Sequence, residues 1–281
     1  MPFATRFAPS PTGFLHKGHA YSALIASCAA QEAGGRFILR IEDTDFTRCR
    51  PEFEASIYED LRWLGIDWET PVLRQSDHRA DYEAAIERLR EMGVLYRCFR
   101  TRKEQMALTG VAPHAGDPKD RQAFRGEPHA PEEEAAFLAE GRPFAWRLSL
   151  EAARRRLGGF DRLTWIEEGL QPGERSAQPE PLGDMVMGRK DIGAGYVIAS
   201  VVDDARQGIS HVIRGVDLAE LTSVQRVLQA LLDLPTPVYR HHALVLDETG
   251  KRLAKRDGST SLKSLRDAGL TREALLKELG L

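Results

Sequence analysis

The sequence predicts an α/β fold in which a parallel sheet is interrupted by an insertion. Strand and helix patterns alternate over roughly the first 65 residues, an order typical of parallel sheets. From about residue 100 to 183 the segments are more polar and rich in glycine and proline, which is typical of an inserted segment. Strand-like sequence then resumes, and a chain of 281 residues is long enough for one large domain with an insertion.

The elements expected before the insertion follow from hydrophobic spacing. Phe53, Ile57 and Leu61 recur at helical intervals, and Pro51 suits the first turn of that helix. The predicted elements are a buried strand at 3–8, a helix at 19–33, a strand at 37–42, a helix over 51–66, a helix near 78–92 and a strand-like run, VLYRCF, at 94–99.

The insertion and the segments after it predict fewer regular elements. Two short strand-like runs, FAWRLSL and RLTWIEE, lie within the insertion. After it, we expect sheet-like segments in MVMGRKD, YVIASVVDDA and ISHVIRG, a helix over 217–232, a strand-like run in VYRHHALVLD and a last helix at 271–279.

Composition excludes several classes of protein. A net charge of −3 disfavours indiscriminate binding of nucleic acid, which requires a strongly basic domain. Cys28, Cys49 and Cys98 are far apart and contain no C-x-x-C pair, so neither a disulfide framework nor a zinc ribbon is indicated. The sequence contains no apolar run of membrane-spanning length and no signal-peptide core at its start, so we expect a cytoplasmic protein.

The turn RFAPSPTGFLHKGH, residues 6–19, joins the first strand to the first helix. A glycine-containing loop at a helix N-terminus leaves backbone N–H groups to bind a phosphate. His16 and His19 share a face if the helix has begun, and their imidazoles can donate to phosphate oxygens in a transition state. Gly18 leaves room for a nucleotide to approach. The alternative is a proline-rich turn with one surface histidine and one capping histidine.

Three further segments carry candidate functional side chains. Glu42, in RIEDTD, follows the second strand, where a substrate ammonium group can be held; alternatively Asp43 or Asp45 caps the next helix. Arg214, in HVIRGVDL, follows a strand and suits a carboxylate, or is an ordinary surface ion-pair partner. In GKRLAKRDGS, residues 250–259, Lys255 is either a cationic clamp on a polyphosphate or part of a solvated charge run.

These segments, taken in order, resemble one family along nearly the whole chain. RFAPSPTG-x-x-H-x-G-H, R-I-E-D-T-D, Y-x-x-A-x-V-V-D-D, H-V-I-R-G-x-D-L and G-K-x-L-x-K-R-D-G resemble the class I glutamyl-tRNA synthetases, with HKGH in place of HIGH and RLAKR in place of KMSKS. A Rossmann-type dehydrogenase is not indicated, because no G-x-G-x-x-G lies between the first strand and helix.

The resemblance implies a class I synthetase-type Rossmann fold, an α/β fold whose parallel sheet has helices on both faces. An inserted α+β subdomain and a short C-terminal helical segment complete it. We therefore expect residues 1–99 and 184–240 to form the catalytic domain, 100–183 the inserted connective subdomain, and 241–281 the basic-loop segment and C-terminal helix, without an anticodon-binding domain.

The resemblance also implies roles for individual residues. ATP would be bound by His16, Gly18, His19 and Lys255, of which the histidines and Lys255 are the catalytic candidates. Glutamate would be bound by Arg6, Ser10, Glu42, Tyr196 and Arg214. The implied reaction forms glutamyl-adenylate and pyrophosphate by positioning and charge stabilisation, with Mg²⁺ sharing the phosphate charge.

The short segment after the basic loop points to a truncated subfamily. It is too short for an anticodon-reading domain, so the chain most resembles the glutamyl-queuosine tRNA(Asp) synthetases. That resemblance implies activation of L-glutamate without tRNA, then transfer to the queuosine base of tRNA(Asp). No pattern in the sequence sets the oligomeric state, and we expect a monomer. The alternatives are a truncated glutamyl-tRNA synthetase that charges tRNA(Glu), and a non-catalytic paralogue that binds tRNA or amino acid.

The sequence departs from the subfamily in two places. Many members bind zinc through C-x-C, a tyrosine and a further cysteine, but here Cys98 is followed by Arg100, and HAGDPKDRQ supplies neither of the others. We therefore expect no structural zinc, and expect His114 and His129 to be surface residues. In the basic loop, Arg252 and Ala254 replace a lysine and a small polar residue, which leaves Lys255 as the strongest candidate there.

Overall fold

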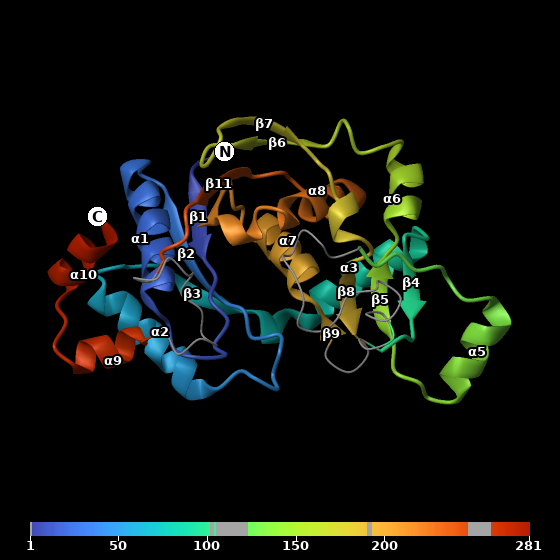
Figure 1. Ribbon diagram of the computed structural model, residues 1–281, viewed down its shortest axis with the longest axis horizontal. Coiled ribbons are helices and arrows are strands. Elements are labelled where there is room, and N and C mark those ends of the chain that lie inside the picture. Colours follow the sequence, from blue (N-terminus) through green and yellow to red (C-terminus); the bar gives the residue numbers. More distant parts are fainter. Residues whose placement is uncertain (1, 102–103, 105–122, 190–192, 247–259) are drawn as a thin grey trace.

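Parallel strands from the N-terminal part of the chain form the sheet β1–β2–β3 (Figure 1). Their bounds are β1 (Ala4–Phe7), β2 (Arg36–Ile41) and β3 (Glu69–Arg74). The computed structural model describes residues 2–101, 104, 123–189, 193–246 and 260–281. Strand bounds match the expected strands at 3–8 and 37–42 to within one or two residues.

A second group of strands lies beside β1 and extends the parallel arrangement. Its order is β10–β11–β6–β7, with β10 (His211–Gly215), β11 (Val238–His242), β6 (Thr164–Glu167) and β7 (Gly173–Ser176). The pairs β10–β11 and β11–β6 are parallel, whereas β6 and β7 form an antiparallel hairpin. The N–H of Ser210 donates to the carbonyl of Ala4 at 3.0 Å, which brings β10 against β1.

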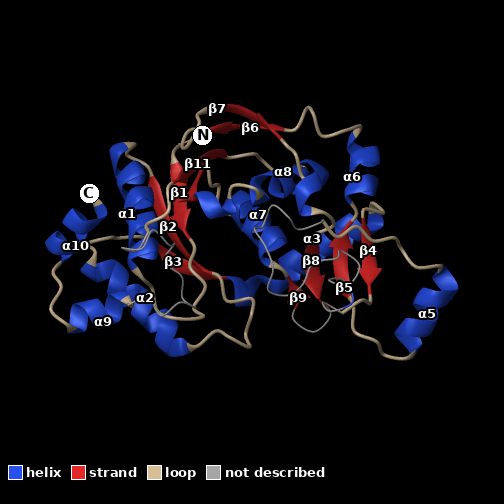
Figure 2. Ribbon diagram, in the orientation of Figure 1, coloured by secondary structure: helices blue, strands red, loops and turns tan. Residues whose placement is uncertain are grey.

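A separate antiparallel sheet lies at the other end of the molecule (Figure 2) and shares a core with α7 (Tyr196–Arg206) and α8 (Leu221–Leu232). Its order is β4–β5–β8–β9, with β4 (Leu95–Cys98), β5 (Ala145–Leu148), β8 (Val186–Arg189) and β9 (Gly193–Ala194). Strand pairing crosses the domain boundaries expected near residues 100 and 183. The strand β4, which precedes residue 100, pairs with β5 of the expected insertion, and β6 and β7, which lie within the expected insertion, join the parallel strands. The division into domains stays a prediction.

Helices cover both faces of the parallel strands, as the alternation of side chains on β2 requires. Leu39 and Ile41 pack on one face against α1 and α2, whereas Ile38 and Arg40 point to the opposite face, toward Tyr239 and α7. The fold class predicted from the sequence is therefore confirmed. The helices are α1 (Lys17–Glu32), α2 (Pro51–Trp63), α3 (Arg79–Glu91), α5 (Pro131–Ala139), α6 (Leu150–Leu157), α7 (Tyr196–Arg206), α8 (Leu221–Leu232), α9 (Leu262–Asp267) and α10 (Arg272–Leu279), with short 3₁₀ turns η1 (Gln75–His78), η3 (Glu180–Leu182) and η4 (Val216–Leu218).

One predicted element was wrong. YVIASVVDDA, read as sheet-like because of its β-branched residues, is the helix α7. Packing overrides the local preference here: Val197, Ile198 and Val201 lie at helical spacing and join a core with buried residues of α3 and α8. The strand β3 and the short helix α9 were not predicted, because Pro71 lies within β3 and α9 has only six residues.

The C-terminal helices dock on the first two helices (Figure 1). Leu262 and Leu275 are fully buried in the core that α1 and α2 share. Arg266 pairs with the buried Asp60 of α2 at 3.0 Å, and the N–H of Leu262 donates to the carbonyl of Leu15 at 2.7 Å. The segment that follows the basic loop is thus held next to the turn that precedes α1. Within the part of the chain that the structure describes, no helix is long and apolar enough to cross a membrane.

A buried ionic cluster joins β1 and β2 to α7. The guanidinium of Arg40, which is wholly buried, donates to Asp204 at 2.8 Å and to Glu42 at 3.3 Å, and its Nε lies 3.9 Å from Asp203. Arg6 donates to Asp204 at 2.9 Å. Two consecutive aspartates at the end of α7 therefore fix this helix against the sheet.

We expect Arg40→Met to lower the free energy of unfolding by about 3–5 kcal/mol, because it leaves buried carboxylates without their partner. Arg36→Met is the matched control: Arg36 is also on β2, but its pair with Glu69 is half-exposed and contributes less than about 1 kcal/mol. Urea unfolding followed by circular dichroism measures both. Equal losses in the two variants would contradict the role given to the buried cluster.

Candidate functional site

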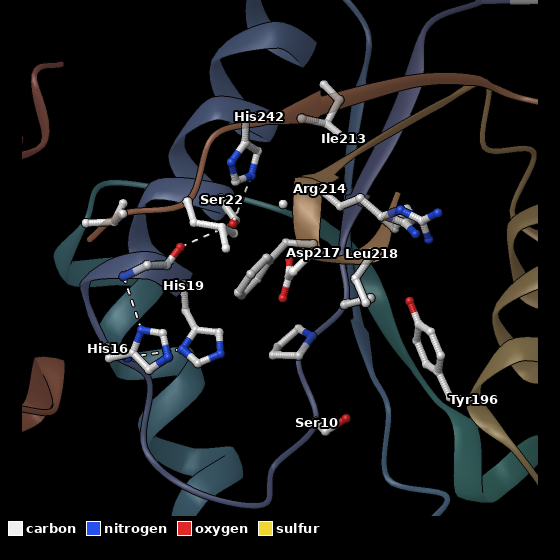
Figure 3. A pocket seen from close by; sticks show the side chains of 18 of the residues that line it. Ser10, His16, His19, Ser22, Tyr196, Ile213, Arg214, Asp217, Leu218 and His242 are labelled. Atoms are coloured by element: carbon white, nitrogen blue, oxygen red, sulfur yellow. Dashed lines mark hydrogen bonds between the residues drawn. The ribbon is translucent and has the colours of Figure 1, made fainter. Parts of the chain in front are cut away.

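A cleft of about 820 Å³ opens where the turn after β1, the start of α1 and the end of β10 meet. The sequence predicts nine site residues. The cleft is lined by seven of them: Arg6, Ser10, His16, Gly18, His19, Tyr196 and Arg214. Glu42 is not among the lining residues, and Lys255, together with Arg252 and Ala254, lies outside the described residues. Figure 3 shows the His16 and His19 rings on one side of the cleft and Tyr196 and Arg214 on the other.

The two histidines form a capping box at the start of α1. His16 is the N-cap, and its Nδ1 accepts from the N–H of Gly18 at 3.1 Å, while Nδ1 of His19 accepts from the N–H of His16 at 3.2 Å. Their ring centroids lie 3.8 Å apart. Because a backbone N–H only donates, each neutral ring carries its proton on Nε2. The cap thus sets the tautomer that lets both rings donate a hydrogen bond.

Gly18 lies in close contact with the histidine cap. A Cβ at this position would lie 3.0 Å from Cε1 and 3.1 Å from Nδ1 of His16, so a larger residue would need the ring to shift by a few tenths of an ångström. The expectation that Gly18 makes room for a nucleotide stays a prediction. Its carbonyl also accepts from Ser22 at 3.1 Å, which ties the first turn of α1 to the cleft wall.

Arg214 lies within β10 rather than after it, and its side chain is buried. Its Nε donates to Nε2 of His241 at 3.1 Å and its Nη2 donates to Thr222 at 2.8 Å. Nη1 is buried and has no hydrogen-bond partner among the described residues. Both partners are uncharged acceptors, so the positive charge of Arg214 has no carboxylate bound to it within the described chain. An anion entering the cleft beside Arg214 would supply the countercharge.

Arg6 differs from Arg214 because Asp204 already pairs with it. Tyr196 begins α7 and lies near both arginines, and burial, reinforced by the charge of Glu42, raises the pKa of its hydroxyl. The tyrosine therefore stays a neutral donor at physiological pH. The two arginines of the site are thus electrostatically unequal, and Arg214 is the stronger anion site.

Glu42 lies behind the cleft, in the buried cluster of Arg40. Burial is the main cause that raises the pKa of Glu42 to about 7, and the charges of Arg40 and Arg6 oppose this shift. A nearby ammonium group would favour the ionised carboxyl. The alternative for this segment was wrong, because neither Asp43 nor Asp45 caps the next helix: the N-cap of α2 is Arg50, without a side-chain hydrogen bond.

Asp43 instead joins the ends of β2 and β3. Its carboxylate accepts from the N–H and hydroxyl of Ser76, at 2.8 and 2.7 Å, and from Arg74 at 3.2 Å. Asp45 binds Thr47 and Arg48 locally, which bends the chain before α2. These carboxylates shape the loop rather than the helix start.

Two polar side chains of the cleft wall, His242 and Asp217, are not among the residues predicted from the sequence. His242 on β11 places Nδ1 2.8 Å from the carbonyl oxygen of Ala243 and Nε2 3.0 Å from the hydroxyl oxygen of Ser22, and burial lowers its pKa. Asp217 is the carboxylate of the described cleft lining (Figure 3). Its position two residues after Gly215, in the motif that contains Arg214, was the available signal.

Aromatic side chains surround the segment in which the zinc ligands of the subfamily are missing. Cys98 is buried in β4, and His129 is partly buried, hydrogen-bonds to Glu133 at 2.9 Å and packs on Phe99 and Phe137. His114 lies outside the described residues. No group of three metal-ligating side chains occurs among the residues described, and the expected absence of zinc stays a prediction.

Comparisons with known proteins agree along the whole chain. The sequence model of a family described as tRNA synthetases class I (E and Q), catalytic domain, matches residues 2–281. A glutamyl-Q tRNA(Asp) synthetase of Rhodobacter capsulatus is 41% identical over 287 residues, covering 99% of both chains. Glutamate–tRNA ligase 2 of a Methylobacterium species is 44% identical over 275 residues, covering 96% of this chain and 58% of its own length.

A solved structure is similar in its backbone. The glutamate tRNA ligase of Elizabethkingia meningosepticum, in complex with its amino acid, superposes with a TM-score of 0.79 at 27% identity. The superposition covers all of this chain and 61% of that one. The chain therefore spans less than two thirds of this ligase and of the Methylobacterium one.

Because His16 is both a helix cap and a hydrogen-bond donor, we expect some His16 variants to lose activity without losing stability. We expect His16→Ala to lower the free energy of unfolding by about 1 kcal/mol, because the N-cap acceptor is lost. His16→Asn keeps a cap acceptor and should unfold like the wild type, yet lose the Nε2–H donor. Thermal unfolding, read alongside turnover, measures both effects. If His16→Asn were as unstable as His16→Ala, the capping role would be wrong.

Proposed function

Because the chain belongs to the class I tRNA synthetases for glutamate and glutamine, we propose that it activates glutamate with ATP in the described cleft and transfers it to a tRNA. Members of this family are ligase-type enzymes that use ATP as a substrate. The proposal extends this to formation of glutamyl-adenylate without tRNA, and to transfer onto the queuosine base of tRNA(Asp).

The observation that carries the amino-acid assignment is the unsatisfied guanidinium of Arg214. A ligand that suits Arg214 would be anionic, because the guanidinium lines the cleft, its Nη1 has no hydrogen-bond partner among the described residues and no carboxylate is bound to it. A glutamate carboxylate meets this requirement, with the Tyr196 hydroxyl nearby as a further donor and Arg6 and Ser10 lining the same cleft. The Glu42 carboxyl, ionised by a substrate ammonium group, would complete amino-acid recognition.

The reaction needs no nucleophile from the protein. An α-carboxylate oxygen of glutamate attacks the α-phosphorus of ATP, the bond to the bridging oxygen breaks, and pyrophosphate leaves with that electron pair. His16 and His19 would donate from Nε2 to phosphate oxygens as charge moves onto the leaving group. Lys255, in the basic loop, would hold the same phosphates. Catalysis is then positioning plus charge stabilisation.

Mg²⁺ fits this site as a phosphate-bound ion. Asp217 is the carboxylate that the described lining offers, and Mg²⁺ is usually held by one or two carboxylates together with substrate phosphates and water. When bound, the ion would neutralise part of the triphosphate charge.

The tRNA acceptor is proposed from likeness along the whole chain. The Rhodobacter relative, a glutamyl-Q tRNA(Asp) synthetase, is matched over 99% of its length, whereas the glutamate–tRNA ligase of Methylobacterium is matched over 58%. We propose a monomer acting on tRNA(Asp) that carries queuosine. The second candidate, charging of tRNA(Glu), draws on the 44% identity to that ligase.

Exchange of pyrophosphate into ATP separates these functions. With glutamate and no tRNA, exchange is expected; exchange only when tRNA(Glu) is added would favour the second candidate, and no exchange at all would leave a non-catalytic binding protein. Labelled glutamate should then attach to tRNA(Asp) that contains queuosine and not to the same tRNA lacking it. Attachment to both forms alike would contradict the queuosine assignment.

The raised pKa of Glu42 predicts a pH dependence of glutamate binding. Below about pH 7 this carboxyl is protonated and cannot hold an ammonium group, so the KM for glutamate should rise as the pH falls through 7. The KM for ATP serves as an internal control and should not follow the same curve. In Glu42→Gln the KM for glutamate should be high and lack this step. A step of the same size in the variant would show that another group titrates.

A further inference from the structure

Arg214 is held by a buried chain of polar side chains that extends away from the cleft. In the parallel pairing of β10 and β11, Arg214 lies opposite His241, whose Nε2 accepts from the arginine Nε at 3.1 Å. On its other side, Nδ1 of His241 lies 2.6 Å from Oε2 of Glu167. Glu167 ends β6, and all three side chains are buried.

Glu167 is fixed by the backbone around it. Its Oε1 accepts from the N–H of His241 at 2.9 Å and from the N–H of Gly169 at 2.9 Å. Gly169 lies so close to β11 that a Cβ there would be 2.1 Å from the carbonyl oxygen of His241. The carboxylate therefore has little freedom to turn away from the imidazole.

Hydrogen-bond chemistry determines the protonation of His241. A guanidinium has no acceptor, so the ring nitrogen facing Arg214 carries no proton, and the proton of the neutral ring lies on Nδ1, toward Glu167. Burial and the charge of Arg214 lower the pKa of His241, which keeps the ring neutral. The other tautomer would place an N–H against the N–H of Arg214.

The imidazole of His241 also keeps the negative charge of Glu167 apart from the positive charge of Arg214. The imidazole and the Thr222 hydroxyl hold Nε and Nη2 of Arg214 with neutral atoms, while the carboxylate of Glu167 stays on the far side of the ring. A carboxylate in direct contact would neutralise the guanidinium, as Asp204 does for Arg6. Arg214 therefore keeps both its orientation and its full charge for a ligand.

We propose that Glu167 and His241 are positioning residues that fix one imidazole tautomer, and thereby aim the charged guanidinium of Arg214 at the carboxylate of the substrate. This inference rests on the proposed function, because it assigns the bound carboxylate to glutamate. It places part of amino-acid recognition on β6, a strand from the segment that sequence analysis assigned to the insertion.

Substitutions that act on opposite ends of the imidazole test the proposal. Glu167→Gln turns an amide N–H toward Nδ1 and forces the proton to Nε2, against Arg214. His241→Asn also removes the acceptor for Arg214, whereas His241→Gln can place its amide oxygen where Nε2 was. We expect the first two to raise the KM for glutamate in pyrophosphate exchange about 10- to 100-fold, with kcat and the KM for ATP little changed.

The matched controls are His241→Gln and Glu168→Gln. His241→Gln should recover most of the glutamate affinity that His241→Asn loses, and Glu168→Gln, exposed and next to Glu167, should behave like the wild type. Equal losses in His241→Gln and His241→Asn, or parallel loss of ATP affinity, would overturn the positioning role in favour of a general structural one. Circular dichroism and thermal unfolding identify any variant that fails to fold.

Histidine ¹⁵N chemical shifts test the inference without activity. In the wild type at neutral pH, the His241 signals should report a proton on Nδ1, and in Glu167→Gln a proton on Nε2; loss of the signals in His241→Gln assigns them. A wild-type ring protonated on Nε2, or on both nitrogens, would overturn the proposal. If exchange with glutamate is absent while the tautomer is as expected, the proposed function fails and the positioning of Arg214 stands.

Discussion

The structure depends on a buried ionic cluster centred on Arg40. A wholly buried guanidinium is tolerated because carboxylates from Glu42, directly after β2, and from α7 surround it, and removing either side would leave charge in a medium that cannot solvate it. The same Asp204 also holds Arg6. One cluster therefore fixes the helix that begins with Tyr196 to the strand that carries Arg6, and so sets two walls of the cleft.

The side chains at the two ends of the cleft are held in place in different ways. At one end, backbone N–H groups hold the His16 and His19 rings, so helix formation itself sets their donors. At the other end, Arg214 is held by side chains from β11, α8 and, through His241, from β6. The first end needs only a local turn, whereas the second needs strands that are far apart in sequence.

This difference explains what could be predicted from sequence. The order of the motifs, the α/β class and the local turn with its histidines follow from short stretches of residues. The helix α7 does not, because its β-branched residues favour a strand until the cores of α3 and α8 are in place. Glu167 and His241 carry no local signal either, since they gain meaning only when β6 pairs with β11.

The β6–β7 hairpin limits how modular the molecule is. Residues 100–183 would be the obvious segment to exchange with a relative when building a chimera. This segment nevertheless contains the hairpin at the edge of the parallel sheet and the Glu167 carboxylate that contacts His241. Grafting would replace part of the support behind Arg214 together with the insertion. A working chimera needs its junctions placed around the hairpin, so that β6 stays with the sheet it completes.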